Sequence, residues 1–376
     1  MSRIYFDNAA TTPIDPEVQK EMLEAMQNLY GNASSIHAEG RMARAALEQA
    51  RKKVANYLGA SIGEIFFTSG GSESNNMVLK GAVRDLGVQR IISTPVEHHC
   101  NLHSFEAIKR DWPEVEIILL SIDEKGLPDL GQLKETLNDQ SKKTLVSLMH
   151  SNNETGSMVD LEAIAEMCDE AGVLFHSDTV QTIGYFPFDL SKTRISFISG
   201  SAHKFYGPKG SGFVYINNEN IVKPMIDGGG QERNMRAGTE SIHNILGLAK
   251  AMELAYDNLE ERKNHVEDLR AYMIQELLKE FDDIHFNGPE TGGHYKVLSV
   301  SFPPSPRAEL LLLNLDIAGI SVSGGSACTS GADAGSHVME AIHGDSPRKT
   351  IRFSFSHHNT REEVDIVMEK LKEILE

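Results

Sequence analysis

Residues 176–209 decide the fold, because two apolar strand patterns in this region are each followed by a residue suited to chemistry. The stretch reads H-S-D-T-V-Q-T-I-G-Y-F-P-F-D-L-S-K-T-R-I-S-F-I-S-G-S-A-H-K-F-Y-G-P-K. Asp178 comes shortly after the apolar run 173–175, and Lys204 shortly after the run 195–198. In open α/β sheets, ligands bind beyond the carboxyl ends of the strands. We therefore expect Asp178 and Lys204 to face one site.

Short apolar runs alternate with helical patterns ahead of this stretch and after it. Strands are predicted at 64–68, 90–93, 115–121, 144–149 and 212–216, and helices at 72–86, 100–110, 129–137 and 160–171. This β-α-β-α order predicts a mainly parallel sheet with helices on both faces, because crossover helices must cover a doubly buried sheet. The fold class is therefore α/β.

The remaining parts of the chain add helices to the large domain and predict a second, smaller domain. Helices are expected at 15–30 and at 38–58, and Gly59 closes the second one as a C-cap. A helical pattern that follows residues 238–240 and continues to about 281 exceeds the usual length, so we interpret it as one long or kinked helix between domains. The mixed strand and helix patterns beyond it suit an α+β domain. We predict a large domain over 15–257 and a small domain over 1–14 and 258–376.

Composition favours small-molecule chemistry inside the cell. The 376 residues include 36 basic and 54 acidic ones, which gives a net charge of −18 and argues against a nucleic-acid or anionic-membrane surface. No apolar run approaches the roughly 18 residues of a spanning helix, and the first residues do not form a signal peptide. The three cysteines, Cys100, Cys168 and Cys328, predict no disulfide framework. We expect a cytoplasmic protein without a membrane or nucleic-acid partner.

An acid and a lysine at neighbouring strand ends suit pyridoxal phosphate (PLP). This cofactor needs a lysine for its aldehyde and an acid for its ring nitrogen, so we hypothesise that Lys204 and Asp178 hold it. The amide of Gln181 is placed to bond the phenolate oxygen. Ser201 and His203, just before the lysine, are candidates for the phosphate, and Lys209 is the alternative lysine.

The segment F-T-S-G-G-S-E-S-N-N, residues 67–76, predicts an anion site. A strand ends at Thr68 and a helix starts near Ser72, so free backbone N–H groups and the positive helix end face one point. A cofactor phosphate fits there. An ordinary capped turn explains the same residues equally well.

The segment E-H-H-C-N-L-H, residues 97–103, offers three histidines. His99 and His103 would share a helix face and suit a metal ion, but no companion ligand motif occurs, so we predict no metal. His98 at the strand-to-helix junction is interpreted as stacking on an aromatic ring and moving protons. A helix-capping or surface histidine is the alternative.

Three further residues are candidates for substrate binding and catalysis. Asn153 follows a strand at the same edge of the sheet, where a simple polar turn is the alternative. Arg352 in T-I-R-F-S-F suits a substrate carboxylate or is an edge-strand charge. Cys328 lies among small residues, which favours an accessible thiol on a mobile loop, whereas Cys168 in a helical pattern suits packing.

Together these motifs resemble a cysteine desulfurase of the class V aminotransferase fold. The resemblance covers nearly the whole chain and is carried, in order, by D-N-A-A-T-T, G-N-A-S-S-I-H, T-S-G-G-S-E-S, E-H-H, N-N-E-T-G, D-T-V-Q, S-A-H-K-x-x-G-P-K-G, R-x-G-T-E, G-S-A-C and I-R-F-S. The G-S-A-C loop is similar to that of the group serving iron–sulfur cluster assembly.

The resemblance implies a role for each candidate. Lys204 would bind PLP covalently, Asp178 would pair with its ring nitrogen, Gln181 would contact its ring oxygen and His98 would stack on the ring. The residues implied for the phosphate are Gly71, Ser72, Ser201 and His203, together with Thr239 of the other subunit of a homodimer. Those implied for the substrate and the chemistry are Asn153, Arg352 and the nucleophile Cys328.

The implied reaction converts L-cysteine into L-alanine. Cys328 would attack the substrate sulfur and carry it as a persulfide to an acceptor, such as an iron–sulfur cluster scaffold protein. Selenocysteine lyase or another PLP β-elimination lyase is the nearest alternative. A silent sulfur-trafficking or scaffold protein and a metal-dependent hydrolase using His98 to His103 are alternatives of other classes.

Overall fold

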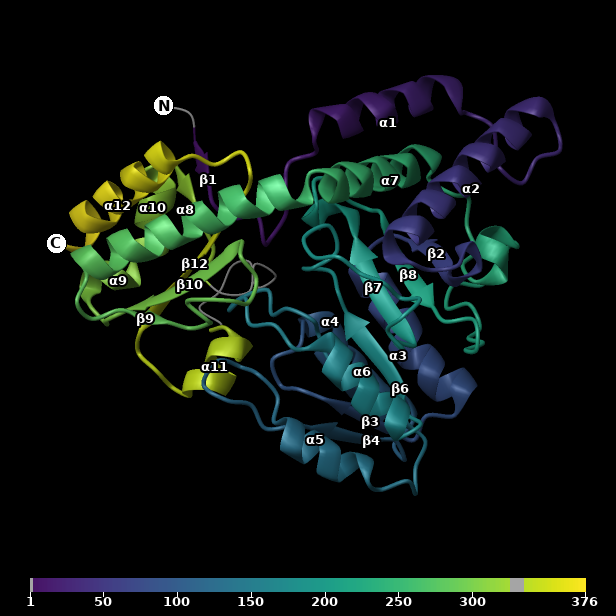
Figure 1. The fold of residues 1–376 in the computed structure, drawn as a ribbon, viewed down its shortest axis with the longest axis horizontal. Coiled ribbons are helices and arrows are strands. Elements are labelled where there is room, and N and C mark those ends of the chain that lie inside the picture. Colours follow the sequence, from purple (N-terminus) through teal and green to yellow (C-terminus); the bar gives the residue numbers. More distant parts are fainter. Residues whose placement is uncertain (1–2, 325–334) are drawn as a thin grey trace.

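The chain folds around one large sheet and a smaller group of strands and helices beside it (Figure 1). The structure, a computed structural model, describes residues 3–324 and 335–376. Within these ranges there are a seven-stranded, a three-stranded and a two-stranded sheet. No helix in the described ranges has the length and apolar character needed to cross a membrane.

The large sheet confirms the predicted mainly parallel arrangement. Its strands are β2 (Ile65–Thr68), β3 (Arg90–Ser93), β4 (Glu116–Leu119), β5 (Thr144–Ser147), β6 (Leu174–Asp178), β7 (Phe197–Ser201) and β8 (Gly212–Ile216). Their order is β2-β8-β7-β6-β5-β3-β4. β8 runs antiparallel to β2 and β7, and the other neighbours pair in parallel. The carboxyl ends of β5, β6 and β7 consequently meet at one edge.

Helices cover both faces of this sheet because its side chains alternate between two apolar cores. Ile91 and Leu145 belong to one core, and their neighbours Ile92 and Val146 belong to the other. The first core packs against α3 (Gly71–Leu86) and α4 (His99–Asp111). The second packs against α2 (Ala38–Leu58), α5 (Leu130–Leu137), α6 (Leu161–Glu170) and α7 (Ile242–Asp257), and α1 (Pro16–Asn28) lies on α7.

The long helical pattern is two helices, α7 and α8 (Leu259–Glu280), which Figure 1 shows end to end. The break falls at Asn258, whose φ of −111° and ψ of 18° are not helical. α7 is packed in the large-sheet part, whereas α8 packs against α12 (Arg361–Leu375) in the other part. The predicted kink is therefore a true break, while the domain limits 15–257 and 1–14 with 258–376 stay a prediction.

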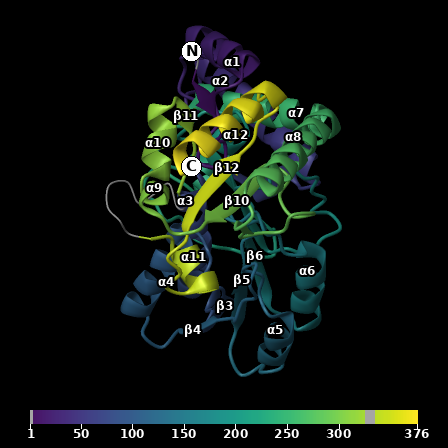
Figure 2. The same cartoon turned by 90° about the vertical axis from the view of Figure 1, so that its left-hand side faces the viewer.

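The smaller part is an α+β unit of strands and helices (Figure 2), and it includes the N-terminal strand. β10 (Val297–Phe302) pairs antiparallel with β12 (Lys349–Ser354) and β9 (His285–Phe286). β1 (Ile4–Tyr5) pairs in parallel with β11 (Ile320–Ser321), and Asp7 bridges to Ser354. Its short helices are α9 (Pro306–Glu309), α10 (Leu311–Ile317) and α11 (His337–His343).

A buried ion pair fastens the segment after β8 to the edge of the large sheet. Arg51 of α2 is 1% exposed and bonds Glu232 at 2.6 and 2.9 Å, and it also donates to the Ile65 carbonyl. Glu232 lies in η3 (Gln231–Asn234) and accepts from the backbone N–H of Phe67 at 2.8 Å. The pair therefore joins α2, β2 and η3.

Replacing Arg51 with methionine is expected to lower the free energy of unfolding by about 3–5 kcal/mol, because it leaves the Glu232 carboxylate buried without its cation. Urea unfolding measures this loss. The double variant R51M/E232Q should lose clearly less, and R110M, which breaks an ion pair with 74% and 44% exposed side chains, should change little. Equal losses in R51M and the double variant would show that packing of Arg51, and not the pair, matters.

Candidate active site

A cavity of about 240 Å³ opens beyond the carboxyl ends of β5, β6 and β7. It gathers every predicted site residue except Thr239 and Cys328. These residues are Gly71, Ser72, His98, Asn153, Asp178, Gln181, Ser201, His203, Lys204 and Arg352. The wall also contains residues to which the sequence assigned no role, among them Ala9, Ala10, Asn75, Cys100, Glu154 and His337.

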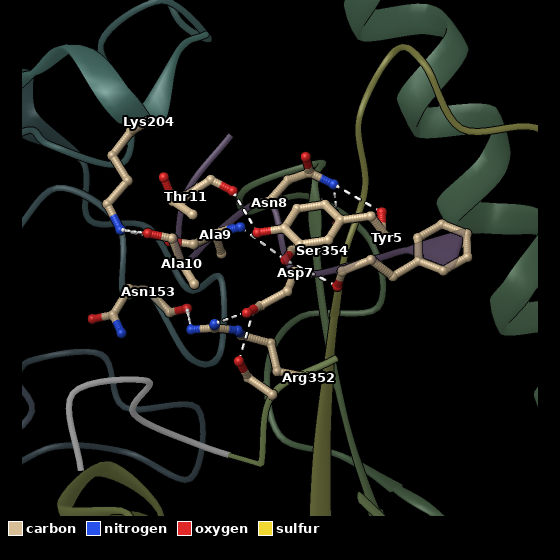
Figure 3. Close-up of polar contacts among 12 residues, drawn as sticks. Tyr5, Asp7, Asn8, Ala9, Ala10, Thr11, Asn153, Lys204, Arg352 and Ser354 are labelled. Carbon is tan, nitrogen blue, oxygen red and sulfur yellow. Dashed lines mark hydrogen bonds and ion pairs between the residues drawn. The ribbon is translucent and has the colours of Figure 1, made fainter. Parts of the chain in front are cut away.

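Lys204 ends η2 (Ala202–Lys204), which directly follows β7. Its Nζ donates to the backbone carbonyls of Ala9 at 2.7 Å and Ala10 at 2.8 Å, as Figure 3 shows. The Tyr185 hydroxyl donates to the Lys204 carbonyl at 2.7 Å and so fixes the main chain. The amine is thus presented to the cavity, whereas Lys209, the alternative lysine, lines a neighbouring cavity instead.

Asp178 is the last residue of β6 and is 6% exposed. Its carboxylate accepts from the Asn75 side-chain amide at 2.6 Å and from the backbone N–H of Val180 at 3.0 Å. Gln181 follows in the same loop and donates to the Ala9 carbonyl at 3.1 Å, while its buried Oε1 has no hydrogen-bond partner among the described residues. The carboxylate and the amide therefore lie in one wall.

The N-terminus of α3 forms the anion end of the site. Gly70 precedes it with a φ of 150°, a conformation that favours glycine, and a Cβ at Gly71 would lie 2.5 Å from Val180 Cγ2. A second cavity of about 360 Å³ shares Gly71, Ser72, Ser201 and His203 with the first and adds Thr11 and Lys209. Hydroxyls, a helix N-terminus and a lysine suit a phosphate.

The surroundings of His203 and Glu73, at this end of the site, determine their charge states. Burial, with Lys204 and Lys209 nearby, lowers the pKa of His203 to about 3, and its Nδ1 lies 3.1 Å from Thr11 Oγ1. Burial alone would raise the pKa of Glu73, but hydrogen bonds from Arg236, at 2.9 Å, and from Ser69 outweigh it and hold this pKa below its usual value. His203 is therefore neutral near pH 7, and the charge of Glu73 is compensated by Arg236.

His98 lines the cavity and also caps α4, so the capping alternative holds together with the site position. Its Nδ1 accepts from the Cys100 backbone N–H at 3.1 Å. Burial lowers the pKa of His98. The rings of His99 and His103 stack with centroids 5.4 Å apart. Within residues 3–324 and 335–376, no group of three or more potential ligands is arranged to hold a metal ion.

Arg352 reaches the opposite side of the cavity from β12. It is 1% exposed, bonds the Asp7 carboxylate at 2.8 Å and donates to the Asn153 carbonyl at 2.8 Å (Figure 3). Ser323 also donates to Asp7, at 2.7 Å. Asp7 was quoted in D-N-A-A-T-T but given no role, since no local signal links it to a residue 345 positions later.

The two remaining candidates lie elsewhere. Thr239 lines a separate cavity of about 210 Å³ together with Thr68, Ser69 and Arg236. Cys328 lies outside the described residues. Residues just after 334 lie at the site again. Ser336 donates to the Glu154 carboxylate, and His337, which lines the cavity, donates to the Glu97 carbonyl at 2.9 Å.

The residues present fit PLP by the chemistry of their donors. A lysine amine and a carboxylate lie in one cavity, and a helix N-terminus that glycine keeps close to Val180 completes an anion site. Such a combination offers a covalent anchor, a partner for a ring nitrogen and a phosphate cradle.

Comparison with known proteins agrees with this chemistry. The aminotransferase class-V family matches residues 4–367. The cysteine desulfurase IscS of Dictyoglomus turgidum is 39% identical over 99% of this chain and 94% of its own length. A solved NifS-like protein has a TM-score of 0.91 at 37% identity and covers 99% of both chains. The solved structure of SspA in complex with cysteine has a TM-score of 0.80 at 29% identity, over 95% of this chain and 100% of its own. The chain therefore belongs to the aminotransferase class-V family, as a PLP-dependent cysteine desulfurase.

Proposed function

We propose that this chain converts L-cysteine into L-alanine and carries the sulfur as a persulfide on Cys328 to an acceptor such as an iron–sulfur scaffold protein. The observation that supports this most is the meeting of Lys204, Asp178 and the N-terminus of α3 in one cavity. The acceptor is proposed from the resemblance of the G-S-A-C loop. The site lies between the proposed large domain, 15–257, and the proposed small domain, 1–14 and 258–376.

Each cofactor residue has an atom suited to its proposed task. When bound, PLP supplies an electron sink that stabilises negative charge at the α-carbon of an amino acid. Lys204 Nζ would hold the cofactor aldehyde and, once released by substrate, move the α-proton. Asp178 would hold a proton at the ring nitrogen, and Gln181 would face the ring oxygen. The phosphate would lie against Gly71, Ser72, Ser201 and His203.

Arg352 and Asn153 are proposed to orient the substrate. Asp7 and the Asn153 carbonyl hold the guanidinium in place, and its Nε is buried without a hydrogen-bond partner among the described residues. A planar guanidinium binds a carboxylate through two parallel hydrogen bonds. The substrate carboxylate would therefore bind on the side of the cavity formed by the smaller part of the molecule.

Sulfur transfer needs a nucleophile, which we assign to Cys328. Its thiolate would attack the substrate sulfur, the Cβ–S bond would break, and Cβ would gain a proton to give alanine. The thiols of Cys100 and Cys168 stay protonated at neutral pH, because burial raises the pKa of both to about 12. Neither is suited to be a nucleophile at neutral pH.

A homodimer is proposed because Thr239 lies away from the cavity of its own chain and would reach the phosphate of the other subunit. Exposed apolar side chains support an interface with a second copy. Tyr30 is 78% and Ile36 91% exposed between α1 and α2, and Leu23, Met26 and Met42 on these helices are each more than half exposed. A cytoplasmic location is proposed from the acidic composition and the free thiols.

Replacing Lys204 with alanine should abolish covalent attachment of PLP, because the cavity then lacks its amine. Borohydride reduction followed by peptide mass spectrometry should find the cofactor on Lys204 in the parent protein and on no residue in K204A. The control K209A, which alters the lysine of the neighbouring cavity, should retain the label. A reduced cofactor on Lys209 would show that the wrong lysine was chosen.

Replacing Cys328 with serine should keep the cofactor absorbance but lower sulfide release from L-cysteine by more than about 100-fold, because the sulfur-accepting thiolate is lost. Mass spectrometry of the parent protein after mixing with L-cysteine should show one additional sulfur on Cys328, with alanine formed. C168A is the matched control and should keep its activity. Unchanged turnover in C328S, or a persulfide on another cysteine, would remove Cys328 from the mechanism.

Replacing Arg352 with lysine should raise KM for L-cysteine by about 10- to 100-fold, since one ammonium cannot reproduce the paired N–H donors of a guanidinium. The cofactor absorbance should stay unchanged, which separates substrate binding from damage to the site. A KM equal to that of the parent protein would contradict the proposed carboxylate contact.

A further inference from the structure

One wall of the cavity carries a chain of four hydrogen-bonded side chains, two of which the proposed reaction leaves without a role. The order is His98, Cys100, Asn75 and Asp178, and all four line the cavity. His98 Nδ1 lies 3.0 Å from Cys100 Sγ, Asn75 Nδ2 lies 3.3 Å from the same sulfur, and Asn75 Nδ2 lies 2.6 Å from Asp178 Oδ2. These hydrogen bonds therefore connect His98, which is proposed to stack on the cofactor ring, with Asp178, which is proposed to pair with the ring nitrogen.

The backbone settles which nitrogen of His98 carries the proton. α4 begins at His99, so the N–H of Cys100 belongs to the first turn and has no acceptor within the helix. It donates to His98 Nδ1 at 3.1 Å, as expected for a capping side chain. A ring nitrogen that accepts a hydrogen bond carries no proton, so the proton of the neutral ring lies on Nε2.

Asn75 fixes the direction of the remaining hydrogen bonds. Its amide nitrogen faces both the Asp178 carboxylate and the Cys100 sulfur, so one N–H serves each. Reversing the amide would place two acceptor oxygens 2.6 Å apart, which excludes that orientation. The sulfur therefore accepts from Asn75. Its own S–H faces two acceptors, His98 Nδ1 at 3.0 Å and Asn101 Oδ1 at 3.7 Å, and the shorter distance favours His98 Nδ1. Burial raises the pKa of Cys100 to about 12, which keeps the S–H protonated.

We propose that Cys100 and Asn75 are positioning residues that hold His98 as a neutral imidazole with its proton on Nε2. Nδ1 is occupied by two donors, and loss of the Nε2 proton would create an imidazolate. His98 therefore works as a hydrogen-bond donor that neither takes up nor releases a proton during turnover, and proton movement falls to Lys204. This inference rests on the proposed function and narrows the expectation that His98 moves protons.

The groups around the ring support its neutral form. Burial has the largest effect and lowers the pKa of His98, and the nearby Lys204, His99 and His337 lower it further. The Asp178 carboxylate opposes them. His99 and His337 themselves have lowered pKa values, again mainly because of burial, so they add little positive charge near neutral pH.

Nitrogen NMR of the ¹⁵N-histidine-labelled protein, with and without PLP, tests the proton position without relying on activity. The variant H98N identifies the His98 signals by their disappearance and keeps a side-chain oxygen to cap α4. We expect one unprotonated nitrogen bonded to Cys100 and one protonated nitrogen, with no titration between pH 6 and 9. A proton on Nδ1, or a titration in that range, would overturn the proposal. Because this measurement needs no turnover, failure of the desulfurase assignment would be seen separately.

Variants of the two positioning residues test their part. C100A should shift the Nδ1 signal and lower kcat by about fivefold, because one donor to the ring is lost, and C100S should restore most of both. N75A should shift the Nδ1 signal and also the absorption maximum of bound PLP, because Asp178 loses its amide partner.

The matched controls are C168A and N76A, which remove a thiol and an amide outside this chain of hydrogen bonds. Neither should move the Nδ1 signal. Cys100 and Asn75 variants with Nδ1 signals identical to those of the parent protein would contradict the positioning role, as would equal changes in the controls.

Discussion

The site depends on the hydrogen bonds of residues 7–12, because this turn segment contacts both parts of the molecule at once. The Ala9 carbonyl accepts from Lys204 Nζ, and the Ala9 N–H donates to Ser354 Oγ at 2.8 Å, so one residue contacts both Lys204 and β12. Three residues on, the Thr12 hydroxyl donates to the His203 carbonyl and accepts from the Tyr206 N–H. Lys204 is thereby held against the smaller part of the molecule although it is carried by the large sheet.

The sheet supplies the second constraint, since parallel strands bring residues far apart in sequence to one edge. Asp178 ends β6, Ser201 ends β7, and Asn153 follows β5, so the residues proposed for the ring nitrogen, the phosphate and the substrate meet at one edge of the sheet. The smaller unit then adds Arg352 from the other side. The cavity thus lies where the large sheet and the smaller unit face each other.

The sequence predicts features that depend on neighbouring residues, such as the bounds of strands, but not hydrogen bonds between residues far apart in the chain. The bounds of β3 and β8 were predicted to the residue, because both are short, fully buried strands with an apolar centre. The break at Asn258 was not placed, because helical residues continue on both sides of it. Lysine, aspartate and histidine could be recognised in the site, since their side chains signal their chemistry. The Ala9 and Ala10 carbonyls could not, because every residue has one, and Asp7, Asn75 and Cys100 acquire partners only through folding.

The route of the chain has a mechanical consequence. The described chain leaves the smaller unit after the segment at residues 7–12 to enter α1, and it returns at Asn258 between α7 and α8. Two covalent links alone would leave the parts free to rotate about the line that joins the links, but hydrogen bonds also cross between them, from Lys204 to the Ala9 carbonyl and from Arg352 to the Asn153 carbonyl. A rotation of the smaller part would break both bonds. The distance between Arg352 and Lys204 is therefore fixed by the same hydrogen bonds that orient the two side chains.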